Sequence, residues 1–281
     1  MKIANKWKDF ELLDLDNGYK QERWKDYILV RPDPQVIWND KKQFEYDAYY
    51  HRSSTGGGYW ENKNNLSNWE ISYKELIFNV KLMSFKHTGV FPEQSINWDY
   101  MIDKIKKEKR EIKVLNLFAY TGGATLACLY AGASVVHVDS SKGMVEWAKE
   151  NVKSSKLDDK PVRFIVDDVI KFTEREIRRG NKYDAIIMDP PSYGRGSNGE
   201  IWDIEKDLYT LLNICKNLLS DDPLFVIINS YTTGLSPKVL ENILTKTINN
   251  KGTISSDEIG LESKDGLILP CGIYGRWEKD E

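Results

Sequence analysis

The sequence contains few cysteines and no long apolar run. Its 281 residues include three cysteines, which lie far apart, so neither a disulfide framework nor a cysteine pair at metal-binding spacing is present. No apolar run approaches the roughly 18 residues that a membrane-spanning helix needs. The N-terminal segment also lacks the apolar stretch of a secretory signal. These absences favour a protein of the reducing cytoplasm with no membrane partner.

The chain also lacks an excess of positive charge. It has 40 Lys and Arg against 43 Asp and Glu, and a formal net charge of -3 when histidine is neutral. This balance excludes a globally basic nucleic-acid binder, but it leaves room for a local basic groove. His51 and His137 have no metal-ligand spacing with each other or with a cysteine, so we expect no metal. Aromatic residues, in contrast, are abundant, and most of them are expected to pack in the core.

The composition divides the chain into two predicted domains. Residues 1–75 are rich in Trp, Tyr, Asp and Asn, with short β-prone runs, which predicts a small α+β domain made mostly of short antiparallel strands. In residues 76–281, strand and helix candidates alternate, and repeated βα units predict a parallel sheet covered by helices on both faces. The strand candidates are 113–117, 134–138, 162–166, 183–188, 224–229, 253–259 and 273–277; the helix candidates are 98–109, 123–130, 142–154, 169–178, 205–219 and 237–249.

A polar or glycine-containing segment follows each of the first five strand candidates. These segments are 116–123, 139, 167–168, 189–193 and 229–232. In open parallel sheets, ligands bind at the carboxyl ends of the strands. Five such segments at one edge therefore predict a cofactor groove.

The first three segments each allow a structural alternative. Gly122 and Gly123 let the backbone approach a ligand before a helix begins, although a tight turn without a ligand fits equally well. Asp139 ends the next strand and is placed to hold ribose hydroxyls; its alternative is a helix N-cap, helped by the serines at 140 and 141. Asp168 is placed to accept a hydrogen bond from an adenine amine or to cap the following helix, and one residue can do both.

The sharpest feature is the run Asp189-Pro190-Pro191-Ser192-Tyr193. Proline removes a backbone donor and fixes φ, so two consecutive prolines after a buried strand form a rigid floor that exposes carbonyl oxygens. Asp189 and this floor can accept hydrogen bonds from an amine or a base edge, and Tyr193 can stack on a flat substrate. The alternative is a plain proline turn that ends the strand.

With these residues in place, the chain resembles the class I S-adenosylmethionine-dependent methyltransferases. Segment 116–123 is similar to the family's first motif in its NxFxYTGG variant, and Asp139, Asp168 and 189–193 match the second, third and fourth motifs. This variant resembles the group of bacterial large-subunit rRNA cytosine-5 and guanine-N7 methyltransferases, in which a small EEHEE-like domain precedes the catalytic domain. Segment 87–94 resembles the stretch between those domains that covers the methionine end of the cofactor.

The resemblance implies a Rossmann-like catalytic domain with a mostly parallel seven-stranded sheet, and S-adenosyl-L-methionine as the cofactor. The implied cofactor-binding residues are Phe91, Gln94, Asn116, Phe118, Ala119, Tyr120, Thr121, Gly122, Asp139, Ser140, Asp168 and Asp189. The candidate catalytic residues are Asp189, Pro190, Pro191 and Tyr193, and the candidate substrate contacts are Tyr193 and, from its place in the loop that follows the motif, Arg195. Arg195 lies in the Gly-rich loop 194–199, which we expect to form a substrate lid; a solvated loop charge is the alternative for Arg195.

The sequence departs from this group in two ways. We expect no RNA-binding PUA domain like that of some relatives before residues 1–75. Cytosine-5 chemistry needs a cysteine nucleophile, which in those relatives follows the fifth strand, and segment 228–233 has none. Cys128 and Cys215 fall on predicted helices as core thiols, and Cys271 lies in a loop at the wrong position. We therefore predict direct methyl transfer without a cysteine nucleophile.

The favoured function is methylation of a base in RNA, ribosomal by resemblance alone, in the cytoplasm. One alternative is a methyltransferase that acts on a small molecule or a protein. Another is a non-catalytic cofactor-binding regulator or assembly factor. An NAD-linked dehydrogenase is disfavoured because the GxGxxG pattern is missing. A homodimer is left open.

Overall fold

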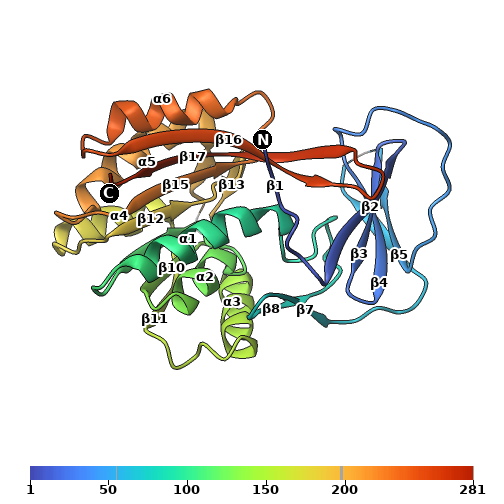
Figure 1. The fold of residues 1–281 in the computed structure, drawn as a ribbon, viewed down its shortest axis with the longest axis horizontal. Coiled ribbons are helices and arrows are strands. Elements are labelled where there is room, and N and C mark those ends of the chain that lie inside the picture. Colours follow the sequence, from blue (N-terminus) through green and yellow to red (C-terminus); the bar gives the residue numbers. More distant parts are fainter. Residues whose placement is uncertain (55, 197–198, 281) are drawn as a thin grey trace. The chain divides into compact units, whose positions relative to one another are not determined.

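The computed structural model describes residues 1–54, 56–196 and 199–280, and these form two compact units. The α/β unit comprises Met1, Asn97–Ile259 and Gly272–Glu281, and the β unit comprises Lys2–Ile96 and Gly260–Cys271 (Figure 1). The division falls after Ile96. The predicted domain boundary after residue 75 stays a prediction about where an independently folding domain begins.

The α/β unit contains most of a large, mostly parallel sheet, although β1 and parts of β16 and β17 are counted in the β unit. The strand order of this sheet is β1-β16-β17-β15-β12-β9-β10-β11. The strands from β15 to β11 run parallel to their neighbours, whereas β17 is antiparallel to β15. The bounds are β1 (Lys2–Ile3), β9 (Lys113–Leu117), β10 (Ser134–Asp139), β11 (Val162–Val166), β12 (Ala185–Met188), β15 (Phe225–Ser230), β16 (Thr253–Glu262) and β17 (Ile268–Glu278). The predicted Rossmann-like class is confirmed, and the short β1 brings the expected seven strands to eight.

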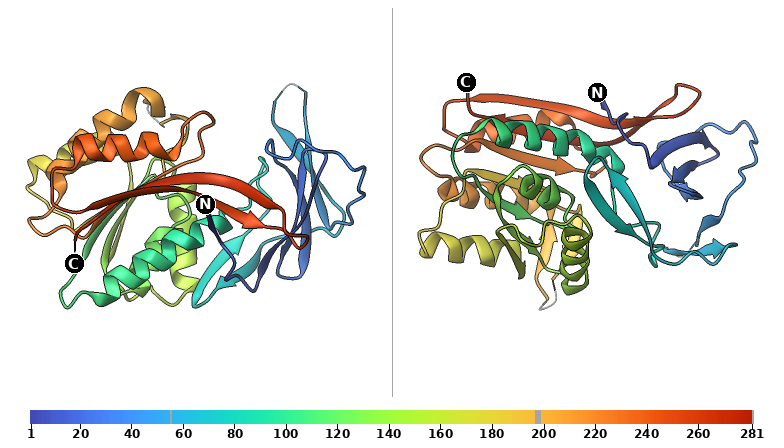
Figure 2. Two further views of the ribbon diagram at one scale, coloured as in Figure 1. Left: turned by 45° about the horizontal axis from the view of Figure 1, so that its top comes forward. Right: turned by 60° about the horizontal axis from the view of Figure 1, so that its bottom comes forward.

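Helices cover both faces of this sheet (Figures 1 and 2). One face carries α1 (Ser95–Lys107), α2 (Gly123–Tyr130) and α3 (Lys142–Ser154). The other carries α4 (Val169–Arg178), α5 (Ile204–Cys215) and α6 (Pro237–Thr247), and a 3-10 turn, η2 (Lys216–Leu218), follows α5. The core lies between the sheet and these helices, where the apolar runs of the central strands are buried on both faces, as parallel sheets require.

A short hairpin occupies the segment that the sequence assigns to a loop. Strand β13 (Tyr193–Arg195) pairs antiparallel with β14 (Ile201–Asp203). The indole N–H of Trp202 donates to the carbonyl of Pro191 at 2.8 Å, which fixes the hairpin to the proline floor. Residues 197 and 198 of the predicted lid lie outside the described residues.

The β unit contains a five-stranded sheet and a separate hairpin. The sheet order is β2-β3-β4-β5-β6, and its pairs are antiparallel except for the parallel pair β4 and β5. The bounds are β2 (Phe10–Asp16), β3 (Tyr19–Trp24), β4 (Tyr27–Pro32), β5 (Ala48–Arg52), β6 (Gly58–Asn62), β7 (Trp69–Tyr73) and β8 (Leu76–Val80); a 3-10 turn, η1 (Pro92–Gln94), comes before α1.

Among the described residues between β2 and β8 there is no α-helix, so this unit is β-rich rather than α+β. A long loop connects β4 to β5. The carboxylate of Asp16 accepts hydrogen bonds from the backbone N–H groups of Asp40 and Lys42, at 2.7 and 2.9 Å, and the indole of Trp38 donates to Leu15. These bonds satisfy the backbone of the loop without a helix.

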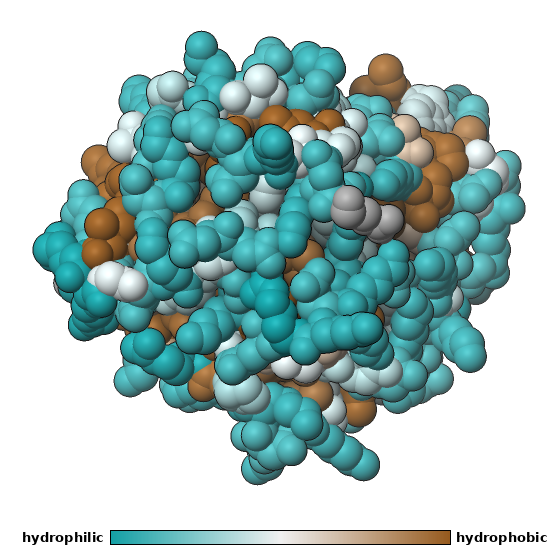
Figure 3. Space-filling view, turned by 60° about the vertical axis from the view of Figure 1, so that its left-hand side comes forward, coloured by the Kyte–Doolittle hydropathy of each residue, from teal (hydrophilic) through white to brown (hydrophobic). Residues whose placement is uncertain are grey.

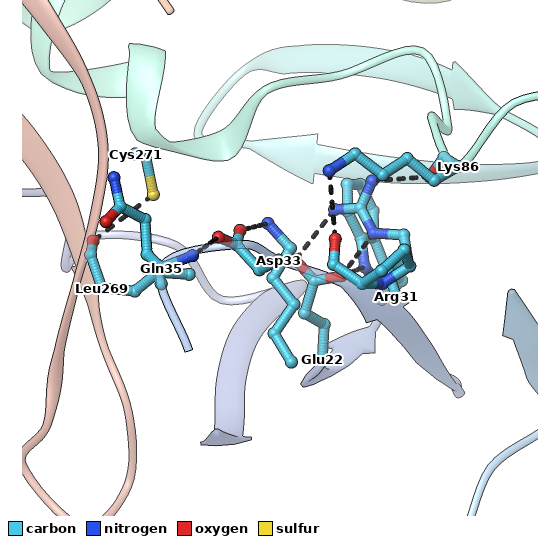
Figure 4. A network of polar contacts seen from close by, with 10 residues as sticks. Glu22, Arg31, Asp33, Gln35, Lys86, Leu269 and Cys271 are labelled. Carbon is cyan, nitrogen blue, oxygen red and sulfur yellow. Dashed lines mark hydrogen bonds and ion pairs between the residues drawn. The ribbon is translucent and has the colours of Figure 1, made fainter. Parts of the chain in front are cut away.

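A network of buried charges stabilises the β unit (Figure 4). The guanidinium of Arg31 donates to both carboxylate oxygens of Glu22, at 2.6 and 2.8 Å, and Glu22 is fully buried. Burial alone would raise the pKa of Glu22, but Arg31 and Lys20 beside it hold that pKa below its usual value. The ammonium of Lys86 donates to the carbonyl of Pro32 at 3.0 Å. Removing one partner would leave a buried charge uncompensated, so these groups act as one structural unit.

In the described part of the chain, no helix is long and apolar enough to cross a membrane. The molecular face in Figure 3 is mostly hydrophilic, with hydrophobic residues gathered in small separate groups.

Candidate functional site

The loop after β9 has an unusual backbone. Phe118 and Tyr120 have φ angles of 51° and 50°, and Gly122 has a φ of 89°, so every second residue is left-handed. Residues other than glycine rarely adopt this backbone conformation, and those that do cluster at ligand sites. Backbone bonds hold the loop, because the Ala119 N–H donates to the Val138 carbonyl and the Gly122 N–H donates to the Ala119 carbonyl, both at 3.0 Å.

The two glycines of this loop allow close packing. A Cβ atom on Gly122 would lie 3.2 Å from the Cβ of Ala148 on α3, and one on Gly123 would lie 2.6 Å from the ring of Trp98 on α1. Packing therefore excludes a side chain at Gly123, and the left-handed φ and close contact together disfavour one at Gly122, as the tight-turn alternative expects. The contact of Gly122 with a cofactor stays a prediction.

Asp139 connects the loop to the next strand. Its carboxylate accepts one hydrogen bond from the Tyr120 N–H at 2.9 Å and another from the Ser141 N–H at 2.8 Å. Burial raises the pKa of Asp139, and these two bonds oppose the rise. The N-cap of α3 is Ser141, whose hydroxyl accepts from the Met144 N–H, so the alternative of Asp139 as the cap is wrong. Ser140 is exposed beside it. Each carboxylate oxygen keeps capacity to accept another donor, such as a ribose hydroxyl.

Buried polar side chains support the loop from below. The amide of Asn116 donates to the hydroxyl of Thr125 at 3.0 Å, and this hydroxyl lies 2.9 Å from Nδ1 of His137. The amide of Asn151 donates to the carbonyl of Thr121 at 2.8 Å. The observed partner of the Asn116 amide is thus helix α2, and its predicted contact with a cofactor stays a prediction. Sequence reasoning missed Thr125, His137 and Asn151, although a polar residue in an otherwise apolar strand or helix face is a usable signal.

The acidic pair after β11 divides its roles. Asp168 is the N-cap of α4, and its Oδ1 accepts from the Lys171 N–H at 2.9 Å. Asp167 forms an ion pair with Arg175. The capping alternative for Asp168 is therefore confirmed. Its contact with an adenine amine stays a prediction, for which the second carboxylate oxygen is the acceptor.

The floor after β12 is tied to its neighbours. The Asp189 N–H donates to the Leu117 carbonyl at 3.4 Å, next to the loop that follows β9. Pro190 is buried and Pro191 is exposed, and the Pro191 carbonyl is already occupied by Trp202. The hydroxyl of Ser192 lies 2.6 Å from that of Thr232, after β15. Residues from three neighbouring strand ends therefore meet at this floor.

The hairpin presents the two predicted substrate residues. Tyr193 is 53% exposed, and Arg195 is exposed as well. The ring of Phe118 lies 4.7 Å from that of Trp202, so the loop after β9 packs against the hairpin. The structure thus brings the segments 116–123, 139 and 189–195 to the same edge of the sheet.

Two predicted cofactor residues belong to the β unit. Phe91 comes directly before η1, with its ring 5.5 Å from that of His87, and Gln94 at the end of η1 is buried. Their predicted place at the methionine end of a cofactor stays a prediction.

The three cysteines are poor nucleophiles. Cys128 and Cys215 are buried, and burial raises both thiol pKa values, that of Cys215 to about 12. The thiol of Cys271 donates to the Leu269 carbonyl at 3.4 Å, and burial raises its pKa well above the usual value (Figure 4). Since the thiolate is the reactive form, none of them is activated. Over the described ranges, no three His, Cys, Asp or Glu side chains are grouped so that they could hold a metal ion.

Residues 38–248 match the family model of the S-adenosylmethionine-dependent methyltransferases. The solved structure of a SAM-dependent methyltransferase from Agrobacterium tumefaciens is 36% identical, with a TM-score of 0.92 over 98% of this chain and 91% of that chain. The solved structure of SMU.776 complexed with SAH is 19% identical, with a TM-score of 0.76 over 97% and 76% of the two chains, and shows the same fold.

Curated relatives match shorter stretches. Ribosomal RNA large subunit methyltransferase K/L from Syntrophotalea carbinolica is 31% identical over 188 residues, which are 64% of this chain and 25% of that protein. Ribosomal RNA large subunit methyltransferase I from Enterobacter sp. is 44% identical over 88 residues, which are 31% of this chain and 22% of that protein. The chain thus spans about a quarter of the length of the curated relatives that it matches.

Proposed function

The chain belongs to the S-adenosylmethionine-dependent methyltransferase family, and on this premise we propose that it methylates a base of ribosomal RNA by direct transfer. The observation that carries the substrate is the similarity to two large-subunit ribosomal RNA methyltransferases. The raised thiol pKa values support direct transfer, because a nitrogen or oxygen nucleophile needs no covalent enzyme intermediate. We place the protein in the cytoplasm, and a homodimer stays a prediction.

The residues at the strand ends fit S-adenosyl-L-methionine, which supplies an electrophilic methyl group when bound. The fit rests on the carboxylate of Asp139, which two backbone N–H groups hold in place while both oxygens can still accept from hydroxyls. We assign the ribose to Asp139 and Ser140, and the adenine amine to the second oxygen of Asp168. We assign the methionine end to Phe91 and Gln94.

The acceptor base is assigned to the proline floor and the hairpin. Asp189 would orient or accept a proton from the attacking amine, and the exposed ring of Tyr193 would stack on the base. Arg195 would contact a phosphate. In this arrangement the protein contributes proximity, in-line orientation and a proton acceptor at the carboxylate of Asp189.

Replacing Asp139 tests the cofactor assignment. Asn keeps the shape of the side chain but loses the charge, so we expect Asp139→Asn to weaken cofactor binding about tenfold or more. Calorimetry with S-adenosyl-L-methionine measures this, and unfolding without cofactor reports on the fold. Asp159→Asn is the matched control, because Asp159 is an exposed carboxylate paired with Lys160. Equal affinities for Asp139→Asn and the control would contradict the assignment.

Replacing Asp189 tests the transfer step. The substrate is total RNA from a strain that lacks the gene, and the assay follows transfer of labelled methyl groups into it. We expect Asp189→Asn to slow this transfer about a hundredfold. Calorimetry with the cofactor separates a loss of the transfer step from a loss of cofactor binding, and Asp159→Asn should leave the rate unchanged. Label that enters only proteins or metabolites would favour the first alternative acceptor class. Cofactor binding without label in any fraction would favour the non-catalytic regulator.

A further inference from the structure

A row of ring side chains lies on one face of the five-stranded sheet in the β unit. Tyr49 and His51 on β5 have ring centroids 4.5 Å apart. His51 stacks on Tyr59 of β6, its direct cross-strand partner, at 5.0 Å with 22° between the planes. Tyr19 on β3 extends the row, 4.9 Å from Tyr49. We call Tyr19, Tyr49, His51 and Tyr59 the ring row.

The ring row becomes more open toward the edge strand β6. Tyr49 is partly covered, the side chain of His51 is 35% exposed, and Tyr59 at the end is 64% exposed. The stack therefore ends in a ring with surface available to a further flat group. Offset stacking of such a group adds to the stability of an aromatic row.

Polar side chains fix the rings in position. Glu61, the cross-strand partner of Tyr49, accepts a hydrogen bond from the Tyr46 hydroxyl at 3.0 Å, and its other oxygen lies 2.8 Å from Nε2 of His51. The ammonium of Lys63 lies 3.6 Å from the centroid of the Tyr46 ring. The charge of Glu61 is thus engaged by local partners.

One cation lies beside the row, at the end away from Tyr59: the ammonium of Lys63 lies over the ring of Tyr46, whose centroid is 5.1 Å from that of Tyr49. Lys63 directly follows β6 and is exposed, whereas Arg52 alternates onto the face of the buried Tyr50, away from the row. The side chain of Lys63 can contact a phosphate of a strand whose bases reach the rings. The outward positions of β5 and β6 in this row are Tyr49, His51, Tyr59 and Glu61, without an aliphatic residue.

We propose that the ring row binds single-stranded RNA, with bases stacked on Tyr59 and His51 and a phosphate held by Lys63. Stacking suits any base, because every base has a π-face. Rings on an open sheet face are a common means of binding single strands, whereas the centre of a protein–protein interface is more apolar than this row. The proposal rests on the RNA substrate proposed above and gives the β unit the task of holding that substrate.

The test is binding of a fluorescein-labelled, 20-nucleotide single-stranded RNA of mixed sequence to the full chain, followed by anisotropy. We expect Tyr59→Ala to weaken binding about tenfold, and Tyr59→Trp to retain it because a larger ring still stacks. The matched control is Tyr209→Ala, since Tyr209 is a 46% exposed tyrosine on α5, outside this sheet. A double variant of His51 and Tyr59 to alanine should weaken binding further.

Several results would overturn the ring-row proposal. One is wild-type affinity in a folded Tyr59→Ala protein, and another is no binding of the RNA by the wild-type chain. A third is a change of oligomeric state on sedimentation with unchanged RNA affinity, which would assign the face to a second copy of the chain. If the Tyr59→Ala protein binds and methylates RNA as well as the wild type does, the ring-row proposal is wrong but the proposed function stands. If Tyr59→Ala weakens RNA binding but the wild-type chain transfers no methyl group to RNA, the ring-row proposal stands and the proposed function is wrong.

Discussion

At the scale of single residues, His137 is a strongly perturbed titratable group among the side chains that support the loop after β9. It is buried, and burial lowers its pKa to about 3, from an ordinary value of 6.5. Below pH 6.5 the unfolded chain binds a proton that the folded protein excludes. Its contribution to stability is therefore complete above pH 6.5 and is lost as the pH falls toward 3, at up to about 1.4 kcal/mol per pH unit.

We expect His137→Gln to reduce the acid dependence of unfolding. The free energy of unfolding, measured with denaturant between pH 7 and 4.5, should fall less steeply with acid in the variant than in the wild type. His87→Gln serves as a positive control, because burial also lowers the pKa of His87, to about 4. Parallel curves for His137→Gln and the wild type would show that the imidazole is protonated in the folded state.

Residues with a strand-end position were the easiest to identify from the sequence. Asp139 and Asp189 follow buried strands, so their place at one edge of the sheet follows from chain order alone. The left-handed φ angles of Phe118 and Tyr120 could not be predicted, because the sequence signals such backbone mainly through glycine. The bond from Asn116 to Thr125 depends on side-chain orientation, which spacing does not fix.

At the scale of elements, helix boundaries followed their capping residues. The predicted ranges of α2, α3 and α4 are confirmed, and Ser141 and Asp168 provide side-chain caps for the last two. Helix α5 was predicted too long, because its apolar periodicity continues through η2, which is a 3-10 turn. The hairpin β13–β14 was missed because three-residue strands carry too little periodicity, and a bond from Trp202 to the proline floor holds them.

The hydrogen bond from Trp202 to Pro191 can be tested by removing its donor. Trp202→Phe keeps an aromatic ring beside Phe118 but removes the N–H that donates to Pro191. We expect a loss of about 1 kcal/mol in the free energy of unfolding, and a several-fold slower methyl transfer with unchanged cofactor affinity. Trp69→Phe is the matched control, because the indole nitrogen of Trp69 has no hydrogen-bond partner among the described residues. Equal effects of the two variants would argue that the hairpin does not depend on this bond.

At the scale of the whole molecule, the division into units could not be predicted as a single cut in the chain. Residues 260–271, late in the sequence, belong to the β unit, because β16 and β17 contribute residues to both units. The two strands were predicted to end at Ile259 and to begin at Ile273, and both run further. The alternation of residues along a long antiparallel strand pair does not change where one unit ends and the next begins. Only the tertiary packing of the strands shows that boundary.

The charge of the whole molecule predicts how strongly salt affects substrate binding. With a net charge of -3, the chain has no general attraction for a polyanion, so RNA affinity must come from a few local cations such as Arg195. Each phosphate contact with a single strand makes the slope of log affinity against log salt more negative by about 0.7. We expect a slope of about −1 to −3 for single-stranded RNA. Arg195→Ala should make this slope less negative by about 0.7, the value of one phosphate contact. Lys160→Ala, which removes an exposed cation paired with Asp159, is the control and should leave the slope unchanged. An affinity independent of salt would contradict an RNA acceptor, because a neutral small molecule releases no counterions when it binds.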